Sequence, residues 1–257
     1  MEYAGKQYVI TFDPGKVNDP AAVQVYRAVH TLMPADNVFS PTGRVLIKDD
    51  LVMQYQVQEQ RHTDTARFVA NLMRREALVD NAILVFDATG VGQAVKDILH
   101  DEGIRDMLPI VYTAGGSVTM KYADATQDKR FVMAQQSNQF VMKILEEVHV
   151  PKNDMVDAAR LALECGEIRI AADLPYAKEF KIQMVNFTGK MNKKGYTSYN
   201  NASDDIHDEW VNCMMMRSWY RHRFRKTLDR LQGAYDKKEE IADILGIGTG
   251  TEAGRWL

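Results

Sequence analysis

The chain has 257 residues, of which 46% are hydrophobic and 26% are charged, a composition typical of a globular protein. It lacks the long apolar run of a membrane-spanning helix, and its first residues, MEYAGKQYVITFD, lack the pattern of a secretory signal. The net charge of −3 excludes a chain that coats nucleic acid by bulk charge, although a local basic groove stays possible. The two cysteines, Cys165 and Cys213, cannot form a disulfide framework, so we expect a reducing, cytoplasmic compartment.

The first part of the chain predicts three strands in a row. The apolar run YVITF at residues 8–12 indicates a buried strand that ends directly on Asp13. Residues 21–29 and 44–57 carry further runs rich in β-branched side chains. Because the connections between them are short, the three strands predict an antiparallel meander.

A strand–helix–strand unit follows this meander. Residues 64–78 predict a helix, and the run AILVF at residues 82–86 is apolar on both faces and ends on Asp87. A strand of this kind is typically central and parallel in its sheet. A helix over residues 91–100 and a strand over residues 108–112 complete the unit, so we expect a mixed α/β sheet.

The second half of the chain predicts mainly helices, at residues 130–148, 154–165, 175–187 and 203–231. Residues 168–170 indicate an edge strand, and the polar, basic stretch at 189–201 indicates a hairpin or a mobile loop. We expect one domain over residues 1–231 and a glycine-rich, partly disordered tail over residues 232–257.

Acidic side chains stand where two strands end and where the last helix begins. The carboxyl ends of neighbouring parallel strands share one edge of a sheet, which would bring Asp13 and Asp87 together. In a helix, Asp204 or Asp205 would share one face with Asp208. Such an all-oxygen cage suits Mg²⁺ or Mn²⁺, and two such ions would stabilise both the attacking and the leaving oxygen of a phosphodiester.

A simpler interpretation exists for each of these acids taken alone. An aspartate at the end of a strand most often closes a turn, and aspartates at a helix start are favoured as caps and by the helix dipole. The recurrence of the three acidic sites in this order favours the metal-binding interpretation.

Three stretches carry a resemblance to a known family. The segments YVITFDPGKVNDPAAV, ILVFDATGVGQAVKDIL and SDDIHDEWVNCMMM resemble the three acidic motifs of the nuclease domain of phage terminase large subunits. The resemblance covers about residues 6–220. It implies an RNase H-like (RuvC-type) α/β fold: a mixed central sheet flanked by helices, with a helical C-terminal extension.

The resemblance also implies an activity, namely metal-dependent endonucleolytic cleavage of concatemeric double-stranded viral DNA during genome packaging. Asp13 matches the first metal ligand and Asp87 the second, with Mg²⁺ or Mn²⁺ as the cofactor, as two ions. The third ligand would be Asp204, Asp205 or Asp208, and Asp208 fits both possible registers of the motif. These acids are the candidate catalytic and metal-binding residues.

The third motif departs from the family pattern at one position, where Glu209 replaces the usual alanine. His207 and Asp19 are auxiliary candidates, for a metal-site or proton-transfer role and for a second acid of the first motif. Both have simpler interpretations, on the helix surface and in a loop. We expect Cys213 and the methionines that follow it to face the core.

Basic residues provide the candidate DNA contacts. Lys190, Lys193 and Lys194 lie in the polar stretch, where a solvated hairpin would also explain them. Arg217 and Arg221 belong to the basic end of the last helix, which the helix dipole alone would favour.

The packaging ATPase half of a terminase carries a Gly-x-x-x-x-Gly-Lys-Ser/Thr loop, which this sequence lacks. We therefore expect the nuclease half alone, as a fragment or as a separate gene product. The resemblance implies double-stranded DNA, the packaging ATPase domain, the portal and the small terminase subunit as partners, with no membrane. It places the protein in the cytoplasm of the infected bacterial host, transiently at the procapsid portal.

Two alternatives remain open at this point. A RuvC-like Holliday-junction resolvase would share the acidic triad and prefer branched DNA. A non-catalytic docking module of the packaging machinery would use the acids as caps and the basic helix to bind a portal or another subunit.

Overall fold

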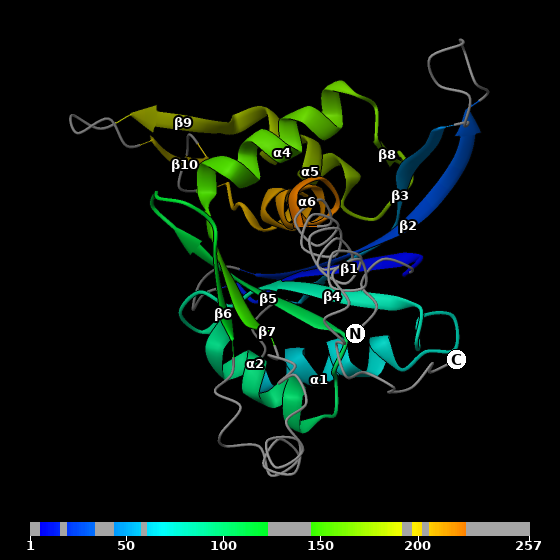
Figure 1. Cartoon of the computed structure of the whole chain (residues 1–257), viewed down its shortest axis with the longest axis vertical. Coiled ribbons are helices and arrows are strands. Elements are labelled where there is room, and N and C mark those ends of the chain that lie inside the picture. The colour runs from blue at the N-terminus through cyan, green and yellow to red at the C-terminus, as the bar shows by residue number, and fades with distance from the viewer. Residues whose placement is uncertain are drawn as a thin grey trace, which may run out of the picture.

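The computed structural model describes residues 6–15, 20–33, 44–57, 61–122, 145–191, 197–201 and 206–224. These residues form an eight-stranded mixed sheet with helices on both faces, and a separate two-stranded sheet beside it (Figure 1). Within these ranges, none of the helices has the length and apolarity needed to span a bilayer.

The predicted meander forms one half of the large sheet. β1 (Tyr8–Asp13), β2 (Ala21–Met33) and β3 (Arg44–Val57) pair antiparallel in sequence order. β8 (Ile168–Ile170) adds to β3 in parallel and forms the outer edge, which confirms the predicted edge strand.

The other half of the sheet is mainly parallel. β4 (Ala82–Asp87) lies between β1 and β5 (Met107–Thr113) and is parallel to both, so the most apolar strand is central, as predicted. β7 (Leu145–Pro151) is parallel to β5, and β6 (Thr119–Tyr122) closes this edge antiparallel to β7.

The helices cover the two faces of the sheet in separate groups (Figure 1). One group packs on the first face through α1 (His62–Met73) and α2 (Gly92–Asp101). The other group comprises α4 (Lys152–Glu164), α5 (Ala177–Asn186) and α6 (Glu209–Trp219), with a π-helical turn, η2 (Tyr220–Phe224), after α6. The small sheet is the hairpin of β9 (Phe187–Met191) and β10 (Thr197–Asn201), so of the two alternatives predicted for this stretch the hairpin is confirmed.

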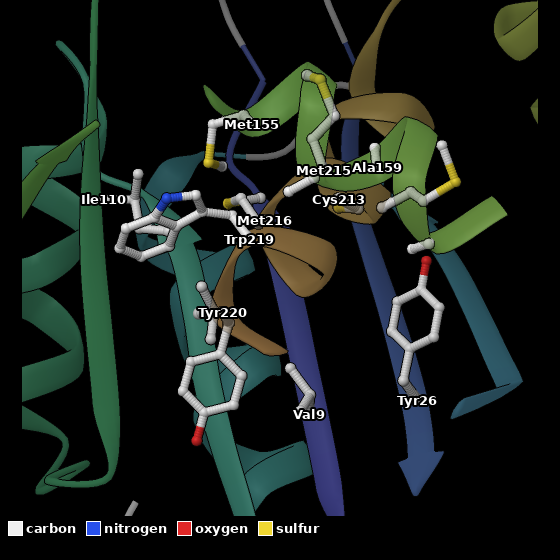
Figure 2. Packing of buried hydrophobic residues seen from close by; sticks show 14 of the residues in the cluster. Val9, Tyr26, Ile110, Met155, Ala159, Cys213, Met215, Met216, Trp219 and Tyr220 are labelled. Atoms are coloured by element: carbon white, nitrogen blue, oxygen red, sulfur yellow. The ribbon is translucent and has the colours of Figure 1, made fainter. Parts of the chain in front are cut away.

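Strand alternation divides the core between the two faces. Val9 and Ile83 point toward α6, whereas their neighbours Ile10 and Leu84 point toward α1 and α2. On the α6 face, sulfur-containing side chains of α4 and α6 pack with Trp219 against the strands (Figure 2). Cys213 and the three methionines after it are buried, as predicted.

Three predicted helix boundaries are wrong. Residues 145–148, expected to end a helix, begin β7, where Val148 and Val150 are fully buried beside β5. α1 ends at Met73 instead of residue 78, and the turns that follow place Asp80 in the left-handed region, with φ of 59°. The last helix starts at Glu209 instead of residue 203. The segments 123–144 and 225–257, which include the predicted domain boundary and tail, lie outside the described residues.

A buried ion cluster joins the last helix to β3, in the antiparallel half of the sheet. Asp49 of β3 and Arg217 of α6 are both fully buried, and the Asp49 carboxylate accepts hydrogen bonds from Arg217 and Arg221. Arg217 also lies over the Tyr26 ring, 6.0 Å from its centroid. The DNA-contact prediction is therefore wrong for Arg217, and the guanidinium of Arg221 is held by the same carboxylate. The basic end of the helix neutralises a buried acid that the sequence pattern did not pair with it.

Replacing Arg217 by Met removes one partner of a fully buried ion pair, and we expect a loss of about 3 kcal/mol in the free energy of unfolding. Urea denaturation measures this loss. Arg160→Met is the matched control, because Arg160 forms an exposed pair with Glu164 that contributes less than about 1 kcal/mol. Equal stability of Arg217→Met and the wild type would contradict this description of the cluster.

Candidate active site

Three neighbouring strands, β1, β4 and β5, each carry one polar side chain near their carboxyl ends, on the side of the sheet that α6 covers. Phe12 of β1 pairs in parallel with Phe86 of β4, so Asp13 and Asp87 are the next residues on adjacent strands. Both lie in the alternation that faces α6, because Val9 and Val85 on the same strands belong to that side of the core. Tyr112, two residues beyond the partner of Asp87 on β5, packs against the same side.

Asp87 is fixed by the loop that follows it, in the segment DATGVG. Its Oδ1 accepts a hydrogen bond from the Thr89 backbone N–H at 2.7 Å. The loop turns back so closely that a Cβ on Gly92 would overlap the Asp87 carbonyl oxygen. Only glycine fits at position 92, and the other glycine of this segment, Gly90, adopts a left-handed φ of 62°.

Asp13 is buried, and α6 contributes to its environment. Its Oδ1 accepts a hydrogen bond from the Gly15 N–H at 3.0 Å, and its Oδ2 accepts one from the Asn212 Nδ2 at 2.8 Å. The amide of Asn212 therefore ties the first turns of α6 to the end of β1.

The two strand-end carboxylates repel each other in a poorly solvated place. Burial, and then the negative charge of Asp13, raise the pKa of Asp87 from 3.8 to about 7. The N–H of Thr89 and the ammonium of Lys152 oppose this shift without cancelling it. The site thus concentrates more negative charge than its own surroundings neutralise.

The start of α6 brings further acids to this site. Asp208 is the N-cap residue, half-buried, and its carbonyl accepts the Asn212 N–H at 2.8 Å. Glu209 follows and is only 4% exposed; its Oε1 accepts a hydrogen bond from Gln56 of β3 at 3.1 Å. Burial raises the pKa of Glu209, with a smaller contribution from Asp13 and an opposing one from His207. Glu209 therefore lies within electrostatic reach of the first motif.

The structure brings together part of the predicted site. Asp13 and Asp87 are neighbours, and α6 presents His207 and Asp208 at its beginning. Lys190 is exposed on β9. The remaining predicted residues, Asp19, Lys193, Lys194, Asp204 and Asp205, lie outside the described residues.

Four residues of the site were not predicted: Glu209, Asn212, Tyr112 and Lys152. Tyr112 carried the same signal as the two aspartates, a polar residue at the end of an apolar strand. Lys152, at the start of α4, donates a hydrogen bond from its Nζ to the Tyr199 carbonyl at 2.9 Å and lies over the rings of Tyr112 and Phe187. Nothing in the sequence around Lys152 or Asn212 indicated this placement.

The donor set suits a hard divalent cation. Asp13 and Asp87 present carboxylate oxygens side by side, and the Asn212 Oδ1 is buried and accepts no hydrogen bond from any residue that the structure describes. In the part of the chain that the structure describes, no three His, Cys, Asp or Glu side chains converge closely enough to hold a metal ion. The two strand-end acids therefore fit as a pair, and the third motif lies partly outside the described residues.

No protein-family model and no curated protein matches this sequence. The solved structure of the large terminase nuclease from the thermophilic phage G20c is similar, with a TM-score of 0.50 and 16% identity over 84% of this chain and 81% of that one. The same nuclease with bound magnesium gives a TM-score of 0.50 and 16% identity over 84% and 82% of the two chains. With bound cobalt, the TM-score is 0.50 at 15% identity over 82% and 79%. At this identity the similarity shows the fold alone: the chain has the RNase H-like fold of a large terminase nuclease, as its motifs predicted.

Proposed function

We propose that this chain is a divalent-metal-dependent endodeoxyribonuclease that cuts double-stranded concatemeric viral DNA during genome packaging. The observation that carries the proposal is the pair of neighbouring strand-end aspartates, Asp13 buried and Asp87 half-buried, with the pKa of Asp87 raised to about 7. Two such carboxylates without a cation destabilise each other, and a bound cation would relieve the repulsion.

Asp13, Asp87 and Asp208 would hold the metal, with Asp204 and Asp205 as further candidates of the same motif. Mg²⁺ or Mn²⁺ bound there would supply charge stabilisation at the attacking and leaving oxygens of the phosphodiester. The chain's own residues provide position. Asn212 orients the Asp13 carboxylate, and the Thr89 N–H and the close approach of Gly92 orient Asp87.

The docking-module alternative explains part of this geometry. Both aspartates accept the backbone hydrogen bond, from Gly15 and from Thr89, that a turn residue would accept. It does not explain why two acidic turn residues, one buried and one half-buried, are neighbours at an electrostatic cost. A junction resolvase would use the same acids, and cleavage of branched against linear DNA distinguishes it from a packaging nuclease.

The packaging context is part of the proposal. The packaging ATPase domain, the portal and the small terminase subunit are the proposed partners, in the cytoplasm of the infected bacterium. Among the proposed DNA contacts that the structure describes, Lys190 on the hairpin is exposed.

Replacing Asp13 or Asp87 by Asn should reduce nicking of supercoiled plasmid in Mg²⁺ or Mn²⁺ by at least about a hundredfold, since each variant removes a ligand charge. EDTA should abolish wild-type nicking. Asp97→Asn, an exposed acid on α2, is the matched control and should cut at the wild-type rate. Wild-type nicking by both site variants, or nicking that is indifferent to EDTA, would overturn the proposal.

Asp208→Asn should lose nicking as fully as Asp13→Asn, because the half-buried Asp208 is the proposed third ligand. Glu209→Gln makes the same charge change one residue later, but its side chain is held under the surface by Gln56, so we expect it to cut within about tenfold of the wild type. The same plasmid assay measures both. The reverse order would assign the third ligand to Glu209.

Without divalent cations, Asp87→Asn should stabilise the protein at high pH. The folded-state pKa of about 7 exceeds the ordinary value of 3.8, so wild-type stability falls as pH rises through this interval. The Asp87→Asn variant has no carboxyl to ionise, so its stability should not fall in this way. It should be more stable than the wild type by about 2–4 kcal/mol at pH 8, with little difference at pH 4. Urea denaturation in EDTA at both pH values measures the effect. A constant difference between Asp87→Asn and wild type across this interval would show that the pKa of Asp87 is not raised in the folded protein.

A further inference from the structure

Gln93, in the first turn of α2, closes the loop that follows Asp87. Its side-chain Nε2 donates a hydrogen bond to the Ala88 carbonyl at 3.2 Å. Ala88 is the residue directly after Asp87, and its own N–H donates to the Ile110 carbonyl of β5 at 2.7 Å. The Gln93 amide therefore fixes the backbone one residue beyond the second aspartate.

The same nitrogen of Gln93 has a second partner, Glu147 of β7. It donates to the Glu147 Oε2 at 2.9 Å, so both hydrogens of the amide nitrogen are used. Glu147 is only 5% exposed, and strand alternation turns it away from α6, because its neighbour Val148 belongs to the core on the α6 side. A buried carboxylate thus holds the side chain that holds the Asp87 loop.

Glu147 is itself held by two lysines and a histidine. The Lys121 Nζ lies 3.4 Å from its Oε1, the Lys96 Nζ 3.6 Å from its Oε2, and the His149 Nε2 2.9 Å from its Oε1. Burial raises the pKa of Glu147, but hydrogen bonds with His149 and Gln93, together with the two ammonium groups, outweigh burial and lower the pKa to about 2. At neutral pH the Gln93 amide therefore donates to a charged acceptor, which makes a strong hydrogen bond.

We propose that Glu147 is a positioning residue of the nuclease site, which acts through Gln93 on the loop that orients the Asp87 carboxylate. The inference rests on the proposed nuclease function. Asp87 Oδ1 accepts the Thr89 N–H of this loop, so a loop that loosens at Ala88 also releases the carboxylate. Groups that orient a metal ligand through an intervening contact typically contribute about tenfold to a hundredfold in metal affinity.

Glu146 distinguishes this role from a purely structural one. Its carboxylate pairs with the same two lysines, at 3.4 Å from the Lys96 Nζ and 3.5 Å from the Lys121 Nζ. The Gln93 amide, however, donates to Glu147. Removal of either glutamate therefore deprives the lysines of a carboxylate, but only removal of Glu147 breaks the link to the Asp87 loop.

Glu147→Ala and Gln93→Ala break the link from its two ends. In EDTA, both variants should show amide hydrogen exchange at residues 88–92 that is faster by at least about tenfold, because the loop opens more often. Isothermal titration with Mn²⁺ should give a dissociation constant weakened by about tenfold to a hundredfold. Glu147→Gln keeps an oxygen acceptor for Gln93 and should restore both values to near those of the wild type. Glu146→Ala is the matched control and should equal the wild type in both measurements.

Wild-type Mn²⁺ affinity in Glu147→Ala and Gln93→Ala would overturn the inference and leave the proposed function intact. Equal weakening of Mn²⁺ binding by Glu146→Ala and Glu147→Ala would also overturn it, because the loss would then come from charge beside the two lysines. A wild type that binds no Mn²⁺ would instead refute the proposed function, and the inference would fall with it.

Discussion

The parallel pairing of β1 with β4 is the constraint on which the site depends. It makes Asp13 and Asp87 neighbours at the carboxyl ends of two central strands, and strand alternation turns both toward α6. The cost is visible in the raised pKa of Asp87, because burial and then the negative charge of Asp13 disfavour the ionised form of its carboxyl. The surrounding contacts hold the pair in place despite this repulsion: the Gly15 and Thr89 N–H groups, the Asn212 amide, and the close approach of Gly92.

α6 connects the carboxyl ends of these strands to the rest of the fold. Its first turns carry Glu209 and Asn212 at the site, and its last turn carries Arg217, which is bound to Asp49 on β3. Between these two ends, cysteine, methionine and tryptophan side chains fill the space against the strands (Figure 2). A helix anchored at both ends in this way can hold an acidic motif at a fixed position over the sheet, which a cation site requires.

The sequence predicted the parts of the fold in which local pattern and tertiary environment agree. Apolar runs that end on Asp13 and Asp87 gave both strands and both acids, because a buried parallel strand must be apolar throughout and its end is where polarity returns. β7 was missed because residues 145–148 contain Glu146 and Glu147, whose charges are compensated by Lys96 and Lys121 from other elements. No local pattern reveals such partners.

The same limitation explains the misplaced arginine and the unforeseen site residues. Arg217 reads as a surface cation because its partner, Asp49, lies more than a hundred residues earlier in the chain. Asn212 and Lys152 reach the site only through the packing of α6 and α4 over the sheet. Tyr112 could have been found, since it ends an apolar strand as the two aspartates do, but acids drew the interpretation toward metal ligands alone.

The central claim is that Asp13 and Asp87 form a cation site. The most direct measurement is the anomalous scattering of crystals of the wild-type protein soaked in Mn²⁺. We predict a strong peak bound by carboxylate oxygens of both aspartates, which disappears in crystals of Asp13→Asn. Soaked wild-type crystals with no peak between these two carboxylates, at Mn²⁺ concentrations that support nicking, would contradict the account.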